Sequence, residues 1–360
     1  MSGPIDQMEL SRERLATLLR STGTEEDELF ERSASVKQAY LGHIVYLRGL
    51  IELSNICEKD CFYCGIRHSN RELNRYRLTH KEVLDAIRFA HEKGFGSVAI
   101  QSGERSSPAF IRGIDKIVRD AQKITGGEIG ITLSCGEQTE ETYRRWFESG
   151  AERYLLRIET SSEKLYKRLH PADEKHSYAR RIRALEALRK TGYQTGSGVM
   201  IGLPFQSEED LADDLLFMRE MDIDMCGMGP YLEHAATPLW EERHRLRPLR
   251  ERLSLSLRMV ALLRILMPDI NIAATTALQA IDKEGREAAI RIGANVLMPN
   301  ITPAPYREDY FLYENKPLSA RNDEEELGYL DARLQAIGHR IGYHHKGNSL
   351  RYKKRTGREQ

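Results

Sequence analysis

The chain has 360 residues, of which 40% are hydrophobic and 30% are charged. This composition is ordinary for a globular protein and sufficient for a large core, which argues against a disordered chain and against a small disulfide-stabilised one. Lys and Arg together number 54, and so do Asp and Glu, so the formal net charge is zero. Because nucleic-acid-binding proteins normally carry a basic excess, we expect no nucleic-acid partner.

Features of membrane and secreted proteins are missing from the sequence. No stretch approaches the roughly 18 consecutive apolar residues that a membrane-spanning helix needs. The first residues lack the basic and then apolar segments of a secretory signal peptide. Five cysteines are an odd and sparse set for a disulfide framework. We therefore expect a cytoplasmic protein that does not contact a membrane.

Short apolar, β-branched segments alternate along the chain with amphipathic helical segments. Two helices have start signals that are typical of a capping box, Thr79 with Glu82 and Ser207 with Asp210. Eight alternations over about 255 residues match the length of an α/β protein with a (β/α)8 TIM barrel, and a doubly wound open sheet is the alternative. The expected strands lie near residues 45–53, 97–101, 128–133, 153–158, 195–201, 223–228, 271–275 and 294–298.

Three parts are expected along the chain. Residues 1–44 form an N-terminal helical extension, residues 45–310 the barrel, and residues 311–360 a C-terminal helical extension with a helix over 322–338. The last fifteen residues carry six Lys or Arg against one acid. Because the chain as a whole is neutral, we interpret this end as a solvated tail rather than a nucleic-acid contact.

Cys57, Cys61 and Cys64 follow the first expected strand in C-x3-C-x2-C spacing. A barrel places its catalytic loops directly after its strands. Three thiolates on one short loop can hold three irons of a 4Fe–4S cluster and leave the fourth iron open for another ligand. His68 follows at a spacing that also permits a Cys3His zinc site, so a zinc-bearing binding protein is the alternative. Cys135, a cysteine outside this loop, is most simply a packing residue.

The loop, with aromatic Tyr63 directly before its last cysteine, resembles the signature of the radical S-adenosylmethionine (SAM) superfamily. This resemblance implies that SAM binds the open iron and is cleaved by one electron to methionine and a 5′-deoxyadenosyl radical. It also implies that Glu104 holds the SAM ammonium, Glu159 the ribose and Arg181 the carboxylate, although each could alone be an ordinary loop or ion-pair residue. The expected cofactor-binding residues are Tyr63, Ser102, Gly103, Glu104, Ser134, Glu159, Arg181 and Met200, the last departing from the isoleucine that is usual there.

A longer resemblance, in order along about residues 45–310, is to the HydE family of FeFe-hydrogenase maturases. Biotin synthase and methylornithine synthase share the expected barrel and cluster loop but fit the other segments less well. The segments that carry the HydE resemblance are 51–57, 74–77, 101–104, 153–157, 213–217, 225–230, 274–277, 293–300 and 302–307.

The HydE resemblance implies a small cysteine-bound iron–carbonyl–cyanide substrate, other hydrogenase maturases as partners, and a reductase, flavodoxin- or ferredoxin-type electron donor. A related radical SAM mutase or synthase with an amino-acid-like substrate is the alternative. Some HydE proteins hold a second cluster on cysteines near the C-terminus; this chain has none after Cys226, so we expect no second cluster. The resemblance places Arg157, Thr275, Thr276, Tyr306 and Tyr310 at the substrate end, although either threonine alone could cap a helix.

Overall fold

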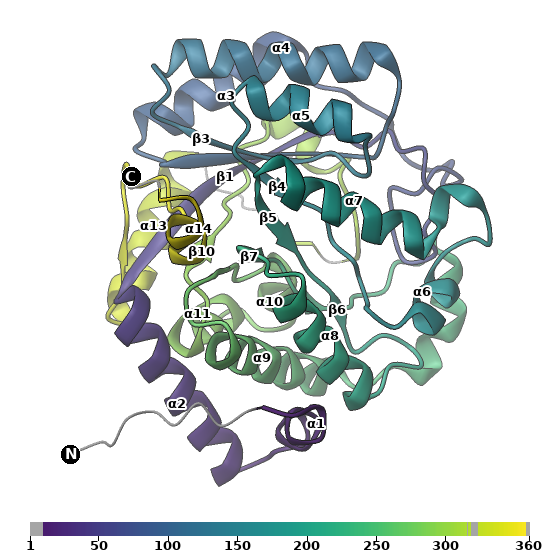
Figure 1. Cartoon of the computed structure of the whole chain (residues 1–360), viewed down its shortest axis with the longest axis vertical. Helices are drawn as coiled ribbons and strands as arrows, with labels where there is room; N and C mark the ends of the chain where they lie inside the picture. The colour runs from purple at the N-terminus through teal and green to yellow at the C-terminus, as the bar shows by residue number, and fades with distance from the viewer. Residues whose placement is uncertain (1–9, 315, 318–322, 358–360) are drawn as a thin grey trace.

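The computed structural model describes residues 10–314, 316–317 and 323–357. Its centre is a curled sheet of parallel strands with helices packed around the outside (Figure 1). The strands are β1 (Ile44–Ser54), β2 (Ser97–Ser102), β3 (Gly130–Ser134), β4 (Arg153–Leu155), β5 (Gln194–Ser197), β6 (Met200–Ile201), β7 (Met225–Cys226), β8 (Gly229–Pro230), β9 (Asn271–Ile272), β10 (Val296–Leu297) and β11 (Arg340–Ile341).

The order of the strands shows that the sheet is a barrel. They follow one another as β10-β1-β2-β3-β4-β5-β7-β9, while β6 and β8 pair with each other beyond the ends of β5 and β7. Ala273 forms a parallel bridge with Val296, and the Ala274 N–H donates to the Val296 carbonyl at 2.9 Å, so the β9 segment is joined to β10. A doubly wound sheet would instead reverse its strand order. The predicted barrel and its eight strands are confirmed within the described residues, and the open-sheet alternative is wrong.

Helices cover the outside of the barrel and begin where the sequence predicted. The capping boxes at Thr79 and Ser207 are both formed. The N-terminal helices pack on the barrel, α1 against α8 and α2 against α9 (Figure 1). The helices are α1 (Arg12–Leu19), α2 (Thr24–Leu41), α3 (His80–Glu92), α4 (Pro108–Ile124), α5 (Glu140–Glu148), α6 (Glu163–Leu169), α7 (Tyr178–Thr191), α8 (Glu208–Glu220), α9 (Leu249–Leu266), α10 (Thr276–Ile281), α11 (Gly285–Ile292), α12 (Ala304–Arg307), α13 (Asp323–Ala336) and α14 (Leu350–Thr356).

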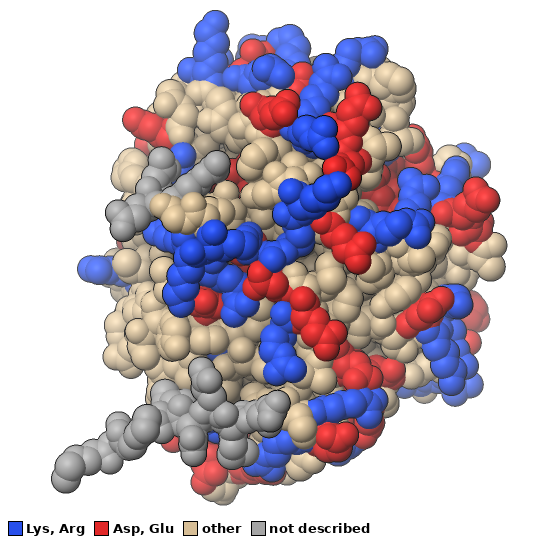
Figure 2. All heavy atoms as spheres, viewed as in Figure 1, with Lys and Arg blue, Asp and Glu red and all other residues tan. Residues whose placement is uncertain are grey.

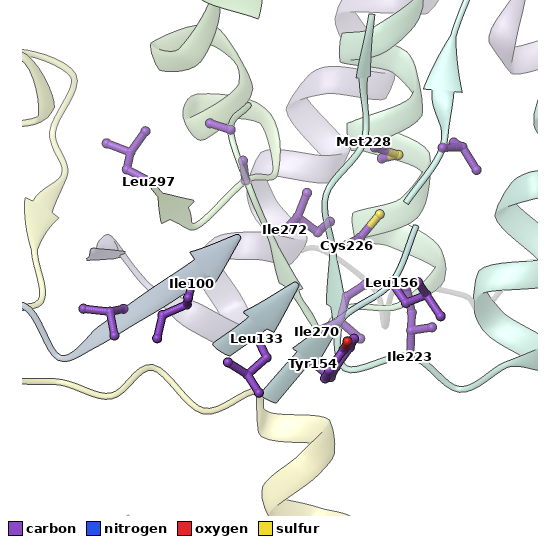
Figure 3. Close-up of a cluster of buried hydrophobic side chains, with 14 of the residues drawn as sticks. Ile100, Leu133, Tyr154, Leu156, Ile223, Cys226, Met228, Ile270, Ile272 and Leu297 are labelled. Atoms are coloured by element: carbon purple, nitrogen blue, oxygen red, sulfur yellow. The ribbon is translucent and has the colours of Figure 1, made fainter. Parts of the chain in front are cut away.

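One continuous apolar core holds the strands in place. Ile100 of β2, Leu133 of β3 and Ile272 of β9 are fully buried, and Figure 3 shows them in the same cluster as Cys226 of β7. Burying an aliphatic side chain of this size stabilises a fold by about 1.5–3 kcal/mol. The packed strands therefore form a rigid frame for the loops that follow them. Among the described residues, no helix has the length and apolar character needed to cross a membrane.

The C-terminal segment packs against the amino-terminal end of the barrel. The helix predicted over 322–338 is α13, and β11 then pairs with β1. On α14, Arg355 pairs with Asp224 at 2.7 Å and Arg351 with Asp269 at 2.9 Å. Figure 2 shows Lys and Arg side chains beside Asp and Glu side chains over this region. The prediction of a solvated tail is wrong for α14, because Arg351, Lys354 and Arg355 pair with acidic residues that precede β7 and β9. Residues 358–360 of the predicted tail lie outside the described residues.

Candidate active site

The carboxyl ends of the strands enclose a cavity of about 390 Å³. Barrel enzymes place their active sites at this end, because the loops that follow different strands converge there. The structure brings together here nearly all the residues that the sequence singled out. The predicted residues that line the cavity are Cys57, Tyr63, Cys61, Cys64, Ser102, Gly103, Glu104, Ser134, Arg157, Glu159, Arg181, Met200, Thr275, Thr276 and Tyr310.

Cys57, Cys61 and Cys64 present three sulfur atoms to one wall of this cavity. Burial raises the pKa of Cys61 to about 12 and that of Cys64 well above its usual value. The free thiols are therefore protonated near neutral pH, and metal binding must displace those protons. The backbone N–H of Lys59 already donates to Cys57 Sγ at 3.4 Å. Three sulfur donors beside a cavity, one buried and two half-buried, fit a 4Fe–4S cluster with one open iron.

The loop that carries the cysteines is held by two neighbouring features. The Arg75 guanidinium donates to the carbonyls of Ile66 and Asn70, each at 2.9 Å, and so ties the far side of the loop together. On the other side, a Cβ at Gly103 would lie 2.4 Å from the Ile56 carbonyl oxygen and 2.9 Å from Cys57 Cβ. Only glycine lets the turn after β2 approach the cluster loop this closely.

Tyr63 is anchored by a buried histidine. Its hydroxyl lies 3.3 Å from Nε2 of His170, whose Nδ1 lies 2.9 Å from the Tyr166 carbonyl. Burial lowers the pKa of His170 to about 3, so the imidazole is neutral. A neutral ring that donates from Nδ1 accepts at Nε2, which makes the Tyr63 hydroxyl the donor. This arrangement fixes the aromatic residue of the cluster motif at the cavity wall.

His68 does not join the three cysteines. Its side chain is exposed, and its Nδ1 lies 3.2 Å from the Cys57 carbonyl oxygen rather than near a sulfur. Among the described residues, no three His, Cys, Asp or Glu side chains are arranged to hold a single metal ion. The structure thus does not assemble the Cys3His zinc site that the spacing allowed.

A buried network of charges lies between the cluster loop and α7. Lys59 Nζ is 3.2 Å from Glu104 Oε1 and 3.1 Å from Glu137 Oε2, and Arg181 Nε is 2.6 Å from Glu137 Oε1. Burial raises the pKa of Glu104, whereas for Glu137 the effect of burial is outweighed by Arg181 and Lys59, which hold its pKa below the usual value. Arg181 also donates to the Arg157 carbonyl. The alternative interpretation of Arg181 as a surface ion-pair residue is therefore wrong, because its side chain is only 8% exposed.

Arg157 and Glu159 form an ion pair at the cavity wall. Arg157 Nη2 lies 2.9 Å from Glu159 Oε2 and donates to the Val199 carbonyl at 2.9 Å. Glu159 has a φ of 68°, in the left-handed region that non-glycine residues rarely adopt. Its backbone is held there by bonds to Gly198 and Met200 on the next strand segment. The unusual conformation directs the end of the β4 segment into the cavity, at a cost of about 1–3 kcal/mol.

The predicted substrate residues differ in their placement. Thr275 caps α10 only through its backbone, and Thr276 Oγ1 lies 3.0 Å from the Tyr313 hydroxyl. Tyr310 is buried in the cavity wall, as expected. Tyr306 is not among the residues that line the cavity: its hydroxyl donates to Glu82 Oε1 at 3.0 Å. The expected position of Tyr306 is therefore corrected, because α12 directs this side chain toward α3 instead of into the barrel.

Several cavity residues were missed from the sequence. Glu52 Oε1 on β1 pairs with Lys316 Nζ, and Asn300 Nδ2 donates to Glu52 Oε2 at 2.9 Å. A charged residue within the mostly apolar strand β1, which also contains Arg48, was the available signal for Glu52. Lys316 lies beyond the expected barrel, so its sequence position carried no such signal. Glu137, which lies behind the cavity wall rather than in it, was also missed, although it follows the end of β3.

The other cysteines and His234 are potentially reactive residues outside the cluster loop, and most of them have structural positions. Cys135 is fully buried and is not part of the cavity wall, whereas Cys226 lines the cavity as a buried thiol. His234 does not line it either, and its Nδ1 accepts from the Ala236 N–H at 3.1 Å. The position of Cys135 agrees with its interpretation as a packing residue, and His234 has a structural position in its loop.

Comparison with known proteins identifies the family. The family model of the radical SAM superfamily matches residues 51–218. The FeFe hydrogenase maturase subunit HydE of Thermotoga maritima is 40% identical over 340 residues, which is 94% of each chain. The chain belongs to the HydE family of radical SAM enzymes. Membership of the superfamily implies a 4Fe–4S cluster and SAM, and it excludes a zinc-bearing binding protein as the function.

Methylornithine synthases are more distant relatives that share the fold of this HydE-family chain. The 3-methylornithine synthase of Methanosarcina acetivorans is 27% identical over 93% of this chain and 91% of its own length. The crystal structure of methylornithine synthase (PylB) superposes with a TM-score of 0.79 over 93% of this chain and 95% of the other, at 24% identity. This likeness independently supports the barrel.

Proposed function

We propose that this enzyme acts in assembly of the active site of FeFe-hydrogenase, on a small cysteine-bound iron–carbonyl–cyanide unit made by another maturase. The observation that carries this proposal is the 40% identity to a HydE over 94% of both chains. A match of that length includes the barrel and the substrate end of the cavity. Other hydrogenase maturases and a reductase, flavodoxin- or ferredoxin-type electron donor are the partners this function requires.

The residues at the cluster end have the chemistry that the two cofactors require. When bound, the cluster and SAM supply reductive cleavage of SAM to a 5′-deoxyadenosyl radical. Cys57, Cys61 and Cys64 would hold three irons. Glu104 would accept the SAM ammonium, since a buried carboxylate beside an ammonium forms a strong charge-assisted bond. Arg181 would meet the carboxylate by the same chemistry.

Further contacts to SAM would come from the neighbouring strand ends. Glu159 would accept hydrogen bonds from the ribose, and Met200 lies at the expected adenine segment. Ser102 is suited to a ligand because its buried hydroxyl has no partner among the described residues. An unpaired buried hydroxyl costs free energy that a bound polar group can offset.

The substrate end combines cationic and hydroxyl groups. Arg157 and Lys316 both line the cavity, together with the hydroxyls of Thr276, Tyr310 and Tyr313. Both cations are paired with carboxylates of the cavity wall, Arg157 with Glu159 and Lys316 with Glu52. A carboxylate- or cyanide-bearing substrate would take the place of these carboxylates as a partner of the cations and accept hydrogen bonds from the hydroxyls. Leu312 and Pro317 also line the cavity. They would help to keep water away from a reactive radical.

The test is in vitro maturation of an apo-FeFe-hydrogenase. The protein is reconstituted anaerobically with iron and sulfide and combined with SAM, reductant and the other maturases. Hydrogen production that depends on this protein supports the proposal. If the protein forms 5′-deoxyadenosine from SAM but leaves the hydrogenase inactive in a reaction that an established HydE completes, the proposal is overturned.

The second candidate is a synthase or mutase that acts on an amino-acid-like substrate. The 27% identity to a 3-methylornithine synthase over 93% of the chain is the observation that favours it. Incubating the same preparation with lysine and SAM, without hydrogenase components, tests it directly. A methylornithine product, separated by chromatography from its isomer lysine before mass spectrometry, would replace the maturation proposal.

A further inference from the structure

Lys59 lies between Cys57 and Cys61 of the cluster motif, and its ammonium is surrounded by hydrogen-bond acceptors. Lys59 Nζ lies 3.2 Å from Glu104 Oε1 and 3.1 Å from Glu137 Oε2, and it donates to the Lys175 carbonyl. The Lys59 side chain is only 6% exposed. Three acceptors for three N–H donors satisfy this buried cation completely.

The two carboxylates that share Lys59 have different surroundings. Glu104 lines the cavity, and its Oε2 accepts from the Glu137 N–H at 2.9 Å. A Cβ at Gly136 would lie 2.2 Å from Glu104 Cγ, so a glycine there leaves room for this side chain. Glu137 lies behind Glu104, is not part of the cavity wall, and is 1% exposed.

Glu137 carries most of the charge compensation in this cluster. Its Oε1 accepts from Arg181 at 2.6 Å, its Oε2 accepts from Lys59 at 3.1 Å, and Arg180 Nε lies 3.0 Å from Oε2 as an ion pair. Glu137 thus pairs with Lys59, Arg181 and the half-exposed Arg180, whereas Glu104 pairs with Lys59. Without the charge of Glu137, Glu104 would be the one carboxylate paired with Lys59 among the described residues.

We propose that Glu137 is a positioning residue for SAM recognition: by binding Lys59, it leaves Glu104 able to accept a second ammonium, the α-ammonium of SAM. This inference rests on the proposed assignment of Glu104 to SAM. A carboxylate has about four lone-pair directions, so Glu104 can bind a new ammonium while Lys59 stays on Glu137. If Glu137 is neutral, Lys59 has only Glu104 as a charged partner, and an incoming ammonium meets an uncompensated cation at low dielectric.

The experiment compares two ligands that differ in the amino-acid group and in the charge on sulfur. SAM carries the ammonium, the carboxylate and a sulfonium, whereas 5′-methylthioadenosine is a neutral thioether with the same adenosine part, and the control variant below reports any general effect of a lost negative charge on the sulfonium. Binding of each is measured by calorimetry to the anaerobically reconstituted protein, without reductant so that SAM stays intact. We expect Glu137→Gln to weaken SAM binding by at least about tenfold and to leave methylthioadenosine binding within about twofold.

Glu58→Gln is the matched control on the same loop. Glu58 binds the Ser106 hydroxyl at 2.9 Å and does not line the cavity. The control should change the affinity for neither ligand, although it also removes one negative charge. An equal loss of both ligands in Glu137→Gln, or no loss of either, overturns the inference.

A double variant separates positioning from a structural role. This variant carries Lys59→Met together with Glu137→Gln. It has no ammonium at position 59 to compete for Glu104, so SAM affinity should return to within about threefold of the wild type. Removing one cation and one carboxylate together leaves the net charge of the buried cluster unchanged, so this variant should fold even if Glu137→Gln alone does not. A double variant that loads its cluster but binds SAM no better than Glu137→Gln contradicts the inference, and so does one that fails to fold or to load its cluster.

Glu104→Gln tests the underlying assignment by itself. It should weaken SAM binding and spare methylthioadenosine. If it does so while Glu137→Gln has no effect, only the role of Glu137 fails. If Glu104→Gln leaves SAM affinity unchanged, the proposed SAM site is wrong, and the inference fails with it.

Discussion

The two ends of the barrel both bury charged side chains, but they pair them differently. At the amino end, acidic residues that precede the strands bind basic residues of α14, as in the Asp224–Arg355 pair at 2.7 Å. At the carboxyl end, charged residues that follow the strands line a cavity of about 390 Å³. There, Lys59 is shared between two carboxylates, and the buried hydroxyls of Ser102 and Tyr231 have no partner among the described residues.

The charged residues at the amino end of the barrel therefore mainly stabilise the fold, whereas those at the carboxyl end mainly serve ligand binding. A buried charge whose partner belongs to the same chain contributes to the fold, and its removal leaves the partner uncompensated. A polar group that faces a cavity without a partner costs stability and is useful only when a ligand binds it. The comparison predicts that changes at the carboxyl end affect ligands first, and that changes at the amino end affect folding first.

The largest expected effect is loss of the cluster at the carboxyl end. Replacing Cys57, Cys61 and Cys64 together with Ala should abolish bound iron, the brown colour and SAM cleavage, because the described cavity offers no other thiol set of this kind. Iron content, absorbance and 5′-deoxyadenosine are the measurements. His68→Ala is the control and should retain all three. Any 5′-deoxyadenosine above background from the triple variant would contradict the assignment of the ligands.

The next effect is on stability at the amino end. Asp224→Asn removes a fully buried carboxylate that binds Arg355 and accepts from the Thr195 N–H at 3.0 Å, so it should lower the free energy of unfolding by about 3 kcal/mol. SAM affinity of the folded protein should stay within about twofold. Denaturant unfolding and calorimetry measure the two quantities.

Asp213→Asn is the control for this variant. Asp213 pairs with Arg12 through a side chain that is 41% exposed, and such pairs contribute about 0–1 kcal/mol. Equal destabilisation by the two substitutions would show that the buried pairs under the barrel do not stabilise it more than surface pairs do.

The smallest expected effect is a change in pH dependence. Asp214 on α8 accepts from the Ser161 hydroxyl at 2.7 Å behind the β4 loop, and burial raises its pKa to about 7. The folded state therefore binds a proton that the unfolded state has released above pH 3.8. The contribution of Asp214 to stability should fall as the pH rises from about 4 to about 7 and stay constant above that range.

Asp214→Asn should remove this part of the pH dependence, since the amide does not titrate. The thermal midpoint of the variant minus that of the wild type is measured from pH 4.5 to 8, with Asp213→Asn as the reference. We expect the difference to increase with pH and then level off near pH 7. A flat difference would mean that Asp214 is not held in its neutral form by burial.

Much of the site was predictable because its signals are local. The C-x3-C-x2-C spacing placed three thiols on one loop, and the turn at Ser102–Glu104 ended a recognisable strand. Resemblance to the HydE family supplied most of the other cavity residues. Tyr306 was misplaced, because the orientation of a one-turn helix depends on what it packs against, here Glu82 and the ring of Tyr76.

By itself, the sequence determined the strand and helix alternation, the helix starts and the cluster motif. Each of these depends on residues within a few positions of one another, where periodicity, capping and ligand spacing act. Only the tertiary structure decided that Lys59 meets Glu137, 78 positions away, and that Arg355 meets Asp224, 131 positions away. Such charge pairs form because the barrel brings together strand ends that are far apart in the sequence. The local sequence pattern does not show which of these distant residues will meet.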